Sequence, residues 1–121
     1  MARILVVEDD ATIRAMETRI LSGAGHEVLS FQDGASALVA ARQSPPDLVV
    51  LDVMMAGLSG FEVARMLRAE PGTAEVPVLF VTSKTGASAM DEGLRAGGSA
   101  YLTKPFSRAR LLELVRKLLP G

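Results

Sequence analysis

Short runs of apolar residues recur along the chain at fairly even intervals, and segments with the spacing of amphipathic helices lie between them. Such short runs, bounded by polar residues and rich in β-branched side chains, are typical of strands that are buried on both faces of a parallel sheet. The pattern predicts five strands, at residues 4–7, 28–31, 48–51, 78–81 and 100–102.

Polar capping residues and glycines bound the helical segments between these strands. In the first segment, Ile13, Met16 and Ile20 fall on one face, and Asp10 is the expected N-cap. Three further helices are expected to begin at Asp33, at a capping box formed by Ser59 and Glu62, and at Ser107. The third helix is expected to bury Val63, Met66 and Leu67, and the last one Leu111, Leu114, Val115 and Leu118.

The segment at residues 84–98 differs from the other helical segments because it contains four glycines. Gly93 would lie inside the helix, where a glycine costs about 1 kcal/mol relative to alanine. We therefore expect this helix to be the least stable element and the one that moves most readily.

Five strand-then-helix units predict a parallel sheet with helices on both faces. A chain of 121 residues is long enough for one domain with a substantial core, so we expect a single domain over residues 1–121. Right-handed crossovers and this length favour an open, doubly wound α/β sheet over a closed barrel. In such sheets ligands bind at the carboxyl ends of the strands.

Composition narrows the classes of function. The chain is 49% hydrophobic, but no apolar run is long enough to span a membrane, and the amino terminus does not resemble a signal peptide. We therefore expect a cytoplasmic protein with no membrane partner. A net charge of −1 without a basic block argues against direct binding of nucleic acid, and the absence of cysteine excludes thiolate chemistry.

Chemistry-bearing residues follow four of the five predicted strands. Glu8 and Asp9 follow the first strand and Asp52 follows the third, while Thr82 and Lys104 stand at the ends of the fourth and fifth. Because the carboxyl ends of parallel strands meet at one edge of the sheet, we expect these side chains to converge. Each has an ordinary alternative alone: Asp52 as a solvated strand end, Lys104 as part of a turn.

Three converging carboxylates repel one another, by about 4 kcal/mol per pair at 4 Å and an effective dielectric constant of 20. A hard divalent cation such as Mg²⁺, bound by oxygen ligands alone, would relieve that repulsion. A carboxylate beside Mg²⁺, a hydroxyl and a lysine is typical of phosphoryl transfer, with the aspartate as nucleophile. The sequence therefore predicts a phosphoryl-accepting site.

Four motifs, in order along the chain, carry a family resemblance: ILVVEDD, LVVLDVMMAGLSG, VLFVTSK and AYLTKPF. Together they resemble the receiver domain of bacterial two-component response regulators, over essentially the whole chain. The resemblance implies a flavodoxin-like (βα)₅ fold whose five parallel strands have the order 2-1-3-4-5. It also implies a signalling switch controlled by phosphorylation, which slowly hydrolyses its own phosphoryl group and turns over no external substrate.

The resemblance assigns Asp52 as the residue that accepts the phosphoryl group. Mg²⁺, with Mn²⁺ as an alternative ion, would be bound by Asp9, Asp52 and the main-chain carbonyl of Met54, with Glu8 acting through water. The donor would be a sensor histidine kinase or a phosphotransfer protein. A downstream protein target or an output domain outside this chain would read the signal.

Further positions follow from the same resemblance. Thr82 would hydrogen-bond the phosphoryl group, Lys104 would pair with it, and Tyr101 would turn inward when Thr82 moves. The Lys104–Pro105 peptide is cis in this family. The sequence departs from the family at Ala56, where proline is usual, and we expect a less rigid loop there.

Two other functions compete with the switch. An aspartyl-phosphate phosphatase or mutase needs a second carboxylate two residues after the nucleophile, where this chain has Met54. A degenerate receiver that acts only as a scaffold would not need the complete set of site residues. Whether the chain acts alone by docking or belongs to a larger protein stays open.

The remaining residues have ordinary interpretations. His26 is expected to be a solvated surface residue, and Met54 and Met55 are expected to pack in their loop. Lys84 is expected either to border the site or to be solvated. Leu112 and Leu119, which lie off the predicted buried stripe of the last helix, are candidates for a partner surface.

Overall fold

The computed structural model describes residues 2–119, and strands and helices alternate along them. The strands are β1 (Arg3–Val7), β2 (Glu27–Phe31), β3 (Leu48–Leu51), β4 (Val78–Thr82) and β5 (Ala100–Thr103). The helices are α1 (Ala11–Gly23), α2 (Gly34–Gln43), α3 (Gly60–Ala69), α4 (Ala87–Arg95) and α5 (Arg108–Leu118). Every strand expected from the apolar runs is present. Within the described residues, no helix combines the length and apolar character needed to cross a membrane.

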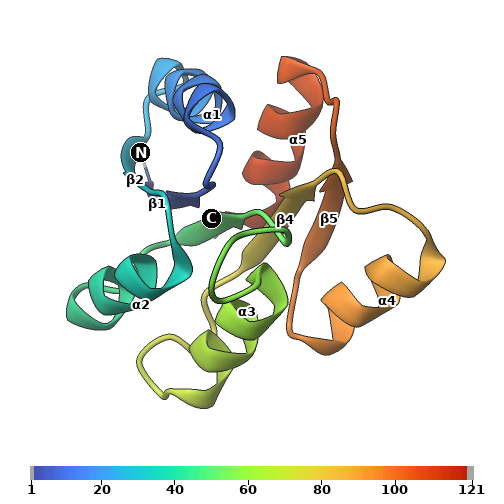
Figure 1. Cartoon of the computed structure of the whole chain (residues 1–121). Coiled ribbons are helices and arrows are strands. Elements are labelled where there is room, and N and C mark those ends of the chain that lie inside the picture. Colours follow the sequence, from blue (N-terminus) through green and yellow to red (C-terminus); the bar gives the residue numbers. More distant parts are fainter. Residues whose placement is uncertain (1, 120–121) are drawn as a thin grey trace.

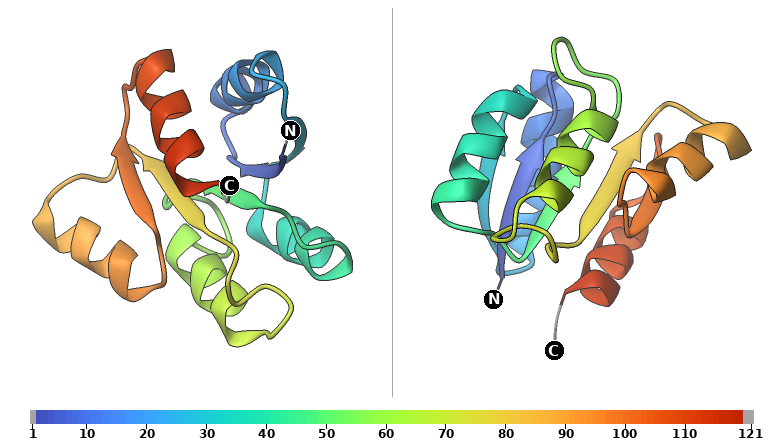
Figure 2. Two further views of the ribbon diagram at one scale, coloured as in Figure 1. Left: turned by 180° about the vertical axis from the view of Figure 1, so that it is seen from behind. Right: turned by 90° about the horizontal axis from the view of Figure 1, so that it is seen from below.

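The five strands form one parallel sheet in the order β2-β1-β3-β4-β5. Helices α1 and α5 cover one face, and α2, α3 and α4 cover the other (Figures 1 and 2). This arrangement confirms the expected doubly wound, flavodoxin-like fold. The strand order reverses direction at β1 and β3, so the carboxyl ends of these two strands form the switch point of the sheet.

Two separate hydrophobic cores result, one on each face of the sheet. Side chains alternate along a strand, so Leu5 and Val7 point to the core under α2 and α3, whereas Ile4 and Val6 point to the core under α1 and α5. Residues of the central strands are almost completely buried on both faces, which explains why the sequence shows continuous apolar runs there instead of an alternating pattern.

The register brings the strand ends to a common level. Val7, at the end of β1, lies opposite Leu51 of β3 and Phe31 of β2, and Thr82 of β4 lies opposite Thr103 of β5. The residues that follow these strands therefore emerge at one edge of the sheet.

Four of the five helices begin with a side-chain cap. Asp10, Asp33, Ser59 and Ser107 each accept a hydrogen bond from a main-chain N–H in the first turn, and Ser59 and Glu62 form the expected capping box. Helix α4 is the exception, because its N-cap is Gly86, which has φ of 104° and no capping side chain.

Two expectations about helix faces are wrong. Met16 and Met66, expected to face inward, are 43% and 40% exposed. In α1 the inward positions are instead Glu17, Ile20 and Leu21. Leu112 and Leu119, the candidates for a partner surface, are partly buried and pack against the core under α1 and α5. The other expected inward residues are borne out in part: Val63 and Leu67 are buried in α3, and Leu111, Leu114 and Val115 are buried in α5.

Candidate functional site

Asp52 stands one residue beyond β3, and its side chain is almost completely buried. Its main-chain N–H donates to the carbonyl of Val7 at 3.0 Å, which extends the β1–β3 pairing to the strand end. Behind it, Gly60 begins α3 so close to the Asp52 carbonyl that a Cβ atom at position 60 would collide with it. The strand and the close approach of α3 together fix the position of this carboxylate.

The acidic residues after β1 take three different positions. Glu8 is 1% exposed, whereas Asp9 and Asp10 are exposed. One carboxylate oxygen of Glu8 accepts from the N–H of Asp10 at 3.1 Å, and Asp10 itself caps α1 through the N–H of Ile13 at 3.0 Å. The expected capping role of Asp10 is therefore confirmed.

Lys104 connects the two buried carboxylates. Its Nζ lies 2.5 Å from Oε1 of Glu8 and 3.1 Å from Oδ2 of Asp52. The residue follows β5, and its main-chain N–H donates to the carbonyl of Thr82 at 2.9 Å, so the sheet edge positions it. The Lys104–Pro105 peptide is cis, as the resemblance implied.

The charges at this edge do not balance. Three carboxylates and one ammonium group would leave two negative charges uncompensated. Burial raises the pKa of Glu8 and the repulsion from Asp52 adds to it, although the hydrogen bonds from Lys104 and Asp10 oppose the shift. Burial lowers the pKa of Lys104, but its hydrogen bonds to Glu8 and Asp52 outweigh this effect and raise the pKa overall.

The acidic cluster suits a metal ion. Carboxylate oxygens of Glu8, Asp9 and Asp52 lie within 4.8 Å of one another, so a single cation could be shared among them. An all-oxygen donor set with surplus negative charge fits a hard divalent cation, because such ions prefer carboxylate, carbonyl and water ligands. The residues present therefore fit Mg²⁺.

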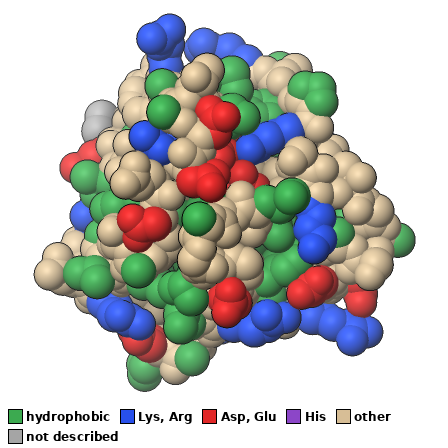
Figure 3. Space-filling view, viewed as in Figure 1, with side chains coloured by type: hydrophobic (Ala, Val, Ile, Leu, Met, Phe, Trp, Pro, Cys, Tyr) green, Lys and Arg blue, Asp and Glu red, His purple; other side chains and the backbone are tan. Residues whose placement is uncertain are grey.

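A cavity of about 600 Å³ opens onto this cluster. Its lining combines charged groups with an apolar wall, and comprises Glu8, Asp9, Asp10, Ile13, Met16, Asp52, Met54, Ser83, Lys104, Pro105 and Phe106. Figure 3 shows acidic side chains gathered near the middle of this face with basic side chains beside them. The sequence did not single out Phe106, although it directly follows Pro105, which was selected.

Thr82 and Tyr101 lie behind the cavity and do not line it. Thr82 is completely buried, and its hydroxyl accepts from the N–H of Lys84 at 3.2 Å. The hydroxyl of Tyr101 donates to the carbonyl of Lys84 at 2.6 Å, and its ring centroid lies 6.0 Å from that of Phe80. The loop after β4 thus contacts both residues.

Met54 and His26 differ from the expectations. The Met54 side chain is 58% exposed beside the cavity and does not pack in its loop, whereas Met55 does pack against the core. His26 is only partly exposed, and its Nδ1 accepts from the N–H of Ala2 at 3.2 Å. Lys84 is exposed and does not line the cavity, which agrees with the solvated alternative, and its ammonium lies 5.8 Å from the centroid of the Phe61 ring.

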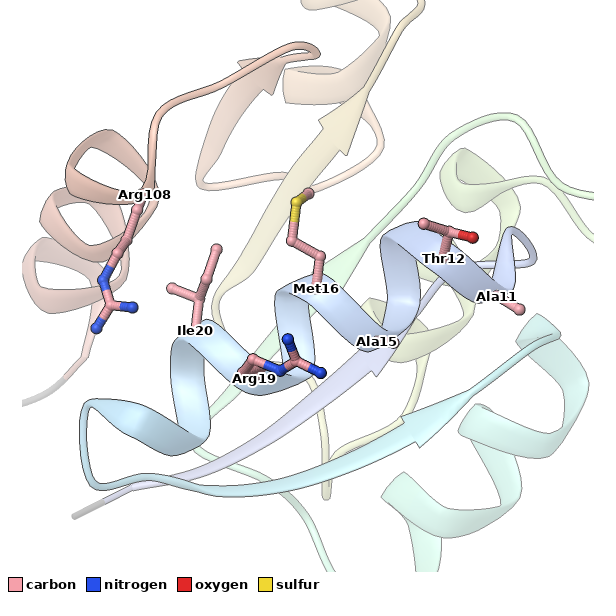
Figure 4. Close-up of a pocket in the computed structure, with 7 residues that line it drawn as sticks. All are labelled: Ala11, Thr12, Ala15, Met16, Arg19, Ile20 and Arg108. Carbon is pink, nitrogen blue, oxygen red and sulfur yellow. The ribbon is translucent and has the colours of Figure 1, made fainter.

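A second groove runs between α1 and α5 (Figure 4). It explains the exposure of Met16, because this side chain and Ile20 line the groove together with Arg19 and Arg108. The groove adjoins the acidic cavity, since Met16 lines both.

Comparison with known proteins gives the family. The sequence profile of the response regulator receiver domain matches residues 4–116. The chain belongs to this family. Receiver domains act as signalling switches, and the fold and the acidic cluster described above agree with that class.

Individual relatives agree with the assignment. Protein PilH from Pseudomonas aeruginosa is 39% identical over 121 residues, which is the full length of both chains. DNA-binding response regulator MtrA from Mycobacterium tuberculosis is 43% identical over 94% of this chain, but this match is 49% of its own length. The chain thus spans about half the length of several curated relatives that it matches. A solved structure of chemotaxis protein CheY4 from Vibrio cholerae has a TM-score of 0.94, with 34% identity over 98% of this chain and 99% of that one.

Proposed function

We propose that this receiver domain is a phosphorylation-controlled switch in which Asp52 accepts the phosphoryl group. The observation that carries the proposal is the joint geometry of Asp52, Glu8 and Lys104: a buried carboxylate at the switch point of the sheet, beside a second carboxylate and within 3.1 Å of an ammonium group. A strand end needs no such arrangement for stability, because clustered carboxylates repel.

In the proposed reaction, a carboxylate oxygen of Asp52 attacks the phosphorus atom of the donor. The new oxygen–phosphorus bond makes an acyl phosphate, and the bond from phosphorus to the leaving nitrogen or oxygen of the donor breaks with its electron pair. Lys104 then pairs with a phosphoryl oxygen in place of Glu8 and Asp52. Slow attack by water on the same phosphorus atom breaks its bond to the Asp52 oxygen, which releases inorganic phosphate and returns the free carboxylate, so no external substrate is turned over.

Glu8, Asp9, Asp52 and the Met54 carbonyl are the residues that would hold Mg²⁺ or Mn²⁺, with Glu8 acting through water. The bound cation would neutralise the charge on the transferred group as it approaches the carboxylates. The chain's own contribution is to fix Asp52 against α3 and to keep Lys104 within reach of the reacting oxygens.

Thr82 and Tyr101 would transmit the change of state. A hydrogen bond from the Thr82 hydroxyl to the phosphoryl group would pull the loop after β4 toward the site. That loop now supplies the carbonyl that holds the Tyr101 hydroxyl, so its movement would free the ring to turn inward. The surface of α4, β5 and α5 would then present a different face to a partner.

The expected partners are a sensor histidine kinase or a phosphotransfer protein as donor, and a protein target or an output domain as receiver of the signal. The cytoplasmic location stays a prediction. The rival phosphatase reading lacks a supporting observation, because Met54, exposed at the position where a second carboxylate would act, carries no acid or base.

The proposal is tested by incubating the chain with acetyl phosphate and Mg²⁺ and measuring its mass. We expect the wild type and the surface variant Asp91→Ala to gain one phosphoryl group, and Asp52→Ala to gain none. We expect chelation of Mg²⁺ to abolish the gain in the wild type and in Asp91→Ala. Labelling of Asp52→Ala at the wild-type rate would show that another residue is the acceptor.

A further inference from the structure

Glu17 is a buried acid that the proposed reaction does not use. It lies in the middle of the inward face of α1, next to Ile20 and Leu21, and only 1% of its surface is exposed. Its Oε2 atom is buried, and no residue within 2–119 forms a hydrogen bond with it. An apolar side chain would be expected at such a position, because a buried polar atom without a partner costs free energy.

Glu17 lies on the inward face of α1, near enough to the acidic cluster to be influenced by the charges of Glu8, Asp52 and Lys104. In the turn of α1 that precedes it, Arg14 donates from Nη1 to the Glu8 carbonyl at 2.8 Å. Residues three positions apart are neighbours on a helix, so Glu17 follows Arg14 on the side of α1 that faces β1. Met16 lies on the adjoining side that faces the groove with α5 (Figure 4).

Burial of a carboxyl group without a hydrogen-bond partner favours the neutral acid over the charged carboxylate. The pKa of Glu17 is raised from 4.5 to about 8, mainly by desolvation and further by repulsion from Glu8 and Asp52, and the attraction of Lys104 opposes this shift. Glu17 is therefore mostly protonated at neutral pH, and its proton is held in part by the negative charge of the acidic cluster.

The other charged groups on the elements around Glu17 lie farther from the cluster or face solvent. Arg108, at the start of α5, has its guanidinium close to the position of Gly23 at the end of α1. Arg3 and Glu27 stand at the amino ends of β1 and β2, the opposite edge of the sheet. The exposed charges are Asp9, Asp10 and Arg19 around α1, and Arg110, Glu113, Arg116 and Lys117 on the outer side of α5.

We propose that Glu17 couples cation binding to proton release: it loses its proton to solvent when a divalent cation binds at Glu8, Asp9 and Asp52. This inference rests on the proposed metal site. The neutral acid becomes a carboxylate and one proton leaves. The new negative charge on Glu17 then partly offsets the positive charge of the bound cation. Because Glu17, Glu8 and Asp52 are buried, solvent and salt screen their interaction weakly.

The linkage is reciprocal. If binding of the cation favours loss of the proton, then loss of the proton favours binding of the cation to the same extent. A downward shift of one pKa unit at Glu17 would correspond to a tenfold gain in affinity for Mg²⁺ across the range in which Glu17 titrates. The receiver domain would then load Mg²⁺ more readily as the pH rises through neutrality.

The test is calorimetric titration of Mg²⁺ into the full chain at pH 7.5, in two buffers with different heats of ionisation, which counts the protons released. We compare the wild type with Glu17→Gln, a neutral substitution of the same shape, and with Glu27→Gln as an exposed control. We expect the wild type and the control to release about half a proton more per Mg²⁺ than Glu17→Gln. The Mg²⁺ affinity of Glu17→Gln should also depend less on pH between 6.5 and 8.5.

A second measurement requires no substitution. The carbon-13 shift of the Glu17 carboxyl in the wild type reports its titration directly, and we expect the midpoint to move to lower pH in Mg²⁺. Equal proton release by wild type and Glu17→Gln, or a midpoint that Mg²⁺ leaves unchanged, overturns the inference but not the proposed function. Absence of Mg²⁺ binding in all three chains at every pH overturns both.

Discussion

Lys104 is the residue on which the geometry of the site depends most. A single ammonium group holds two buried carboxylates, those of Glu8 and Asp52, and leaves Asp9 exposed beside them. In this state the lysine limits the repulsion without removing it, since one positive charge faces three carboxylates. The site therefore stores unfavourable electrostatic energy that a cation can release.

This stored repulsion gives a prediction about stability. In the presence of a chelator, we expect the free energy of unfolding of Asp52→Asn, measured with urea, to exceed that of the wild type by about 1 kcal/mol, because one of the clustered charges is gone. Addition of Mg²⁺ at a hundred times its dissociation constant should stabilise the wild type by about 2.7 kcal/mol. Asp52→Asn should lose most of that gain, because it has lost a ligand.

A matched control for this experiment is Asp91→Asn. Asp91 is exposed on α4 and pairs with Arg95 at 2.9 Å, so its removal should change stability by less than about 0.5 kcal/mol and leave the response to Mg²⁺ intact. An equal response of the wild type and Asp52→Asn to Mg²⁺ would mean that the cluster does not bind the ion.

At the scale of single residues, the sequence predicts a position better than an orientation. Glu8, Asp52 and Lys104 lie together at one edge of the sheet, as expected, because each directly follows a strand and the strand ends converge. Thr82, the last residue of β4, is buried and does not line the cavity. The burial of Glu17 could not be predicted, since the apolar pattern of α1 offered Met16 as a more natural inward residue. Only the packing of α1 on the sheet decides which of two adjacent residues turns inward.

Among the structural elements, α4 is held differently from the other helices. It lacks a side-chain cap at Gly86, and its interior Gly93 is packed so closely on the rings of Tyr101 and Phe80 that a Cβ would lie 3.1 Å and 3.3 Å from them. At its other end, Arg68 of α3 donates to the carbonyl of Gly97 at 2.7 Å. The helix is thus anchored after its carboxyl end and unanchored at its amino end, next to the loop that follows Thr82.

We expect phosphorylation to perturb α4 far more than α2. Conversion of Asp52 to the acyl phosphate should shift the amide NMR signals of Thr82, residues 84–95 and Tyr101 most strongly, because the loop after β4 connects them to the site. Helix α2, capped by Asp33, serves as the internal control. A response confined to α1 would contradict this path of transmission.

The strands and most caps were predictable because each is encoded locally. Continuous apolar runs marked β1, β3 and β4, and Asp10, Ser59 and Ser107 each capped the helix that they were expected to begin. The fourth helix is shorter than the glycine-rich segment suggested, since Gly86 and Gly97 both have φ of 104° and flank it outside the helix.

For the whole molecule, the doubly wound sheet separates stability from function. The two cores lie on either side of the sheet, whereas the acidic site lies at its edge. There the cores fix the positions of the strand ends but do not cover the site. The fold class followed from the alternation of strands and helices, and the register of the sheet, which the sequence does not specify, brings the site residues to one level. The cavity wall formed by Met16, Met54 and Phe106 arises only from this assembly.

The central claim is that Asp52 itself receives the phosphoryl group, and the most direct measurement is the position of that group in the wild-type chain. After incubation with acetyl phosphate and Mg²⁺, borohydride reduces an acyl phosphate to an alcohol with release of phosphate, and peptide mass spectrometry locates the altered residue. We expect the change at Asp52 and at no other carboxylate. Modification at Glu8, Asp9 or Asp10 in its place, or no reducible acyl phosphate at all, would contradict the account.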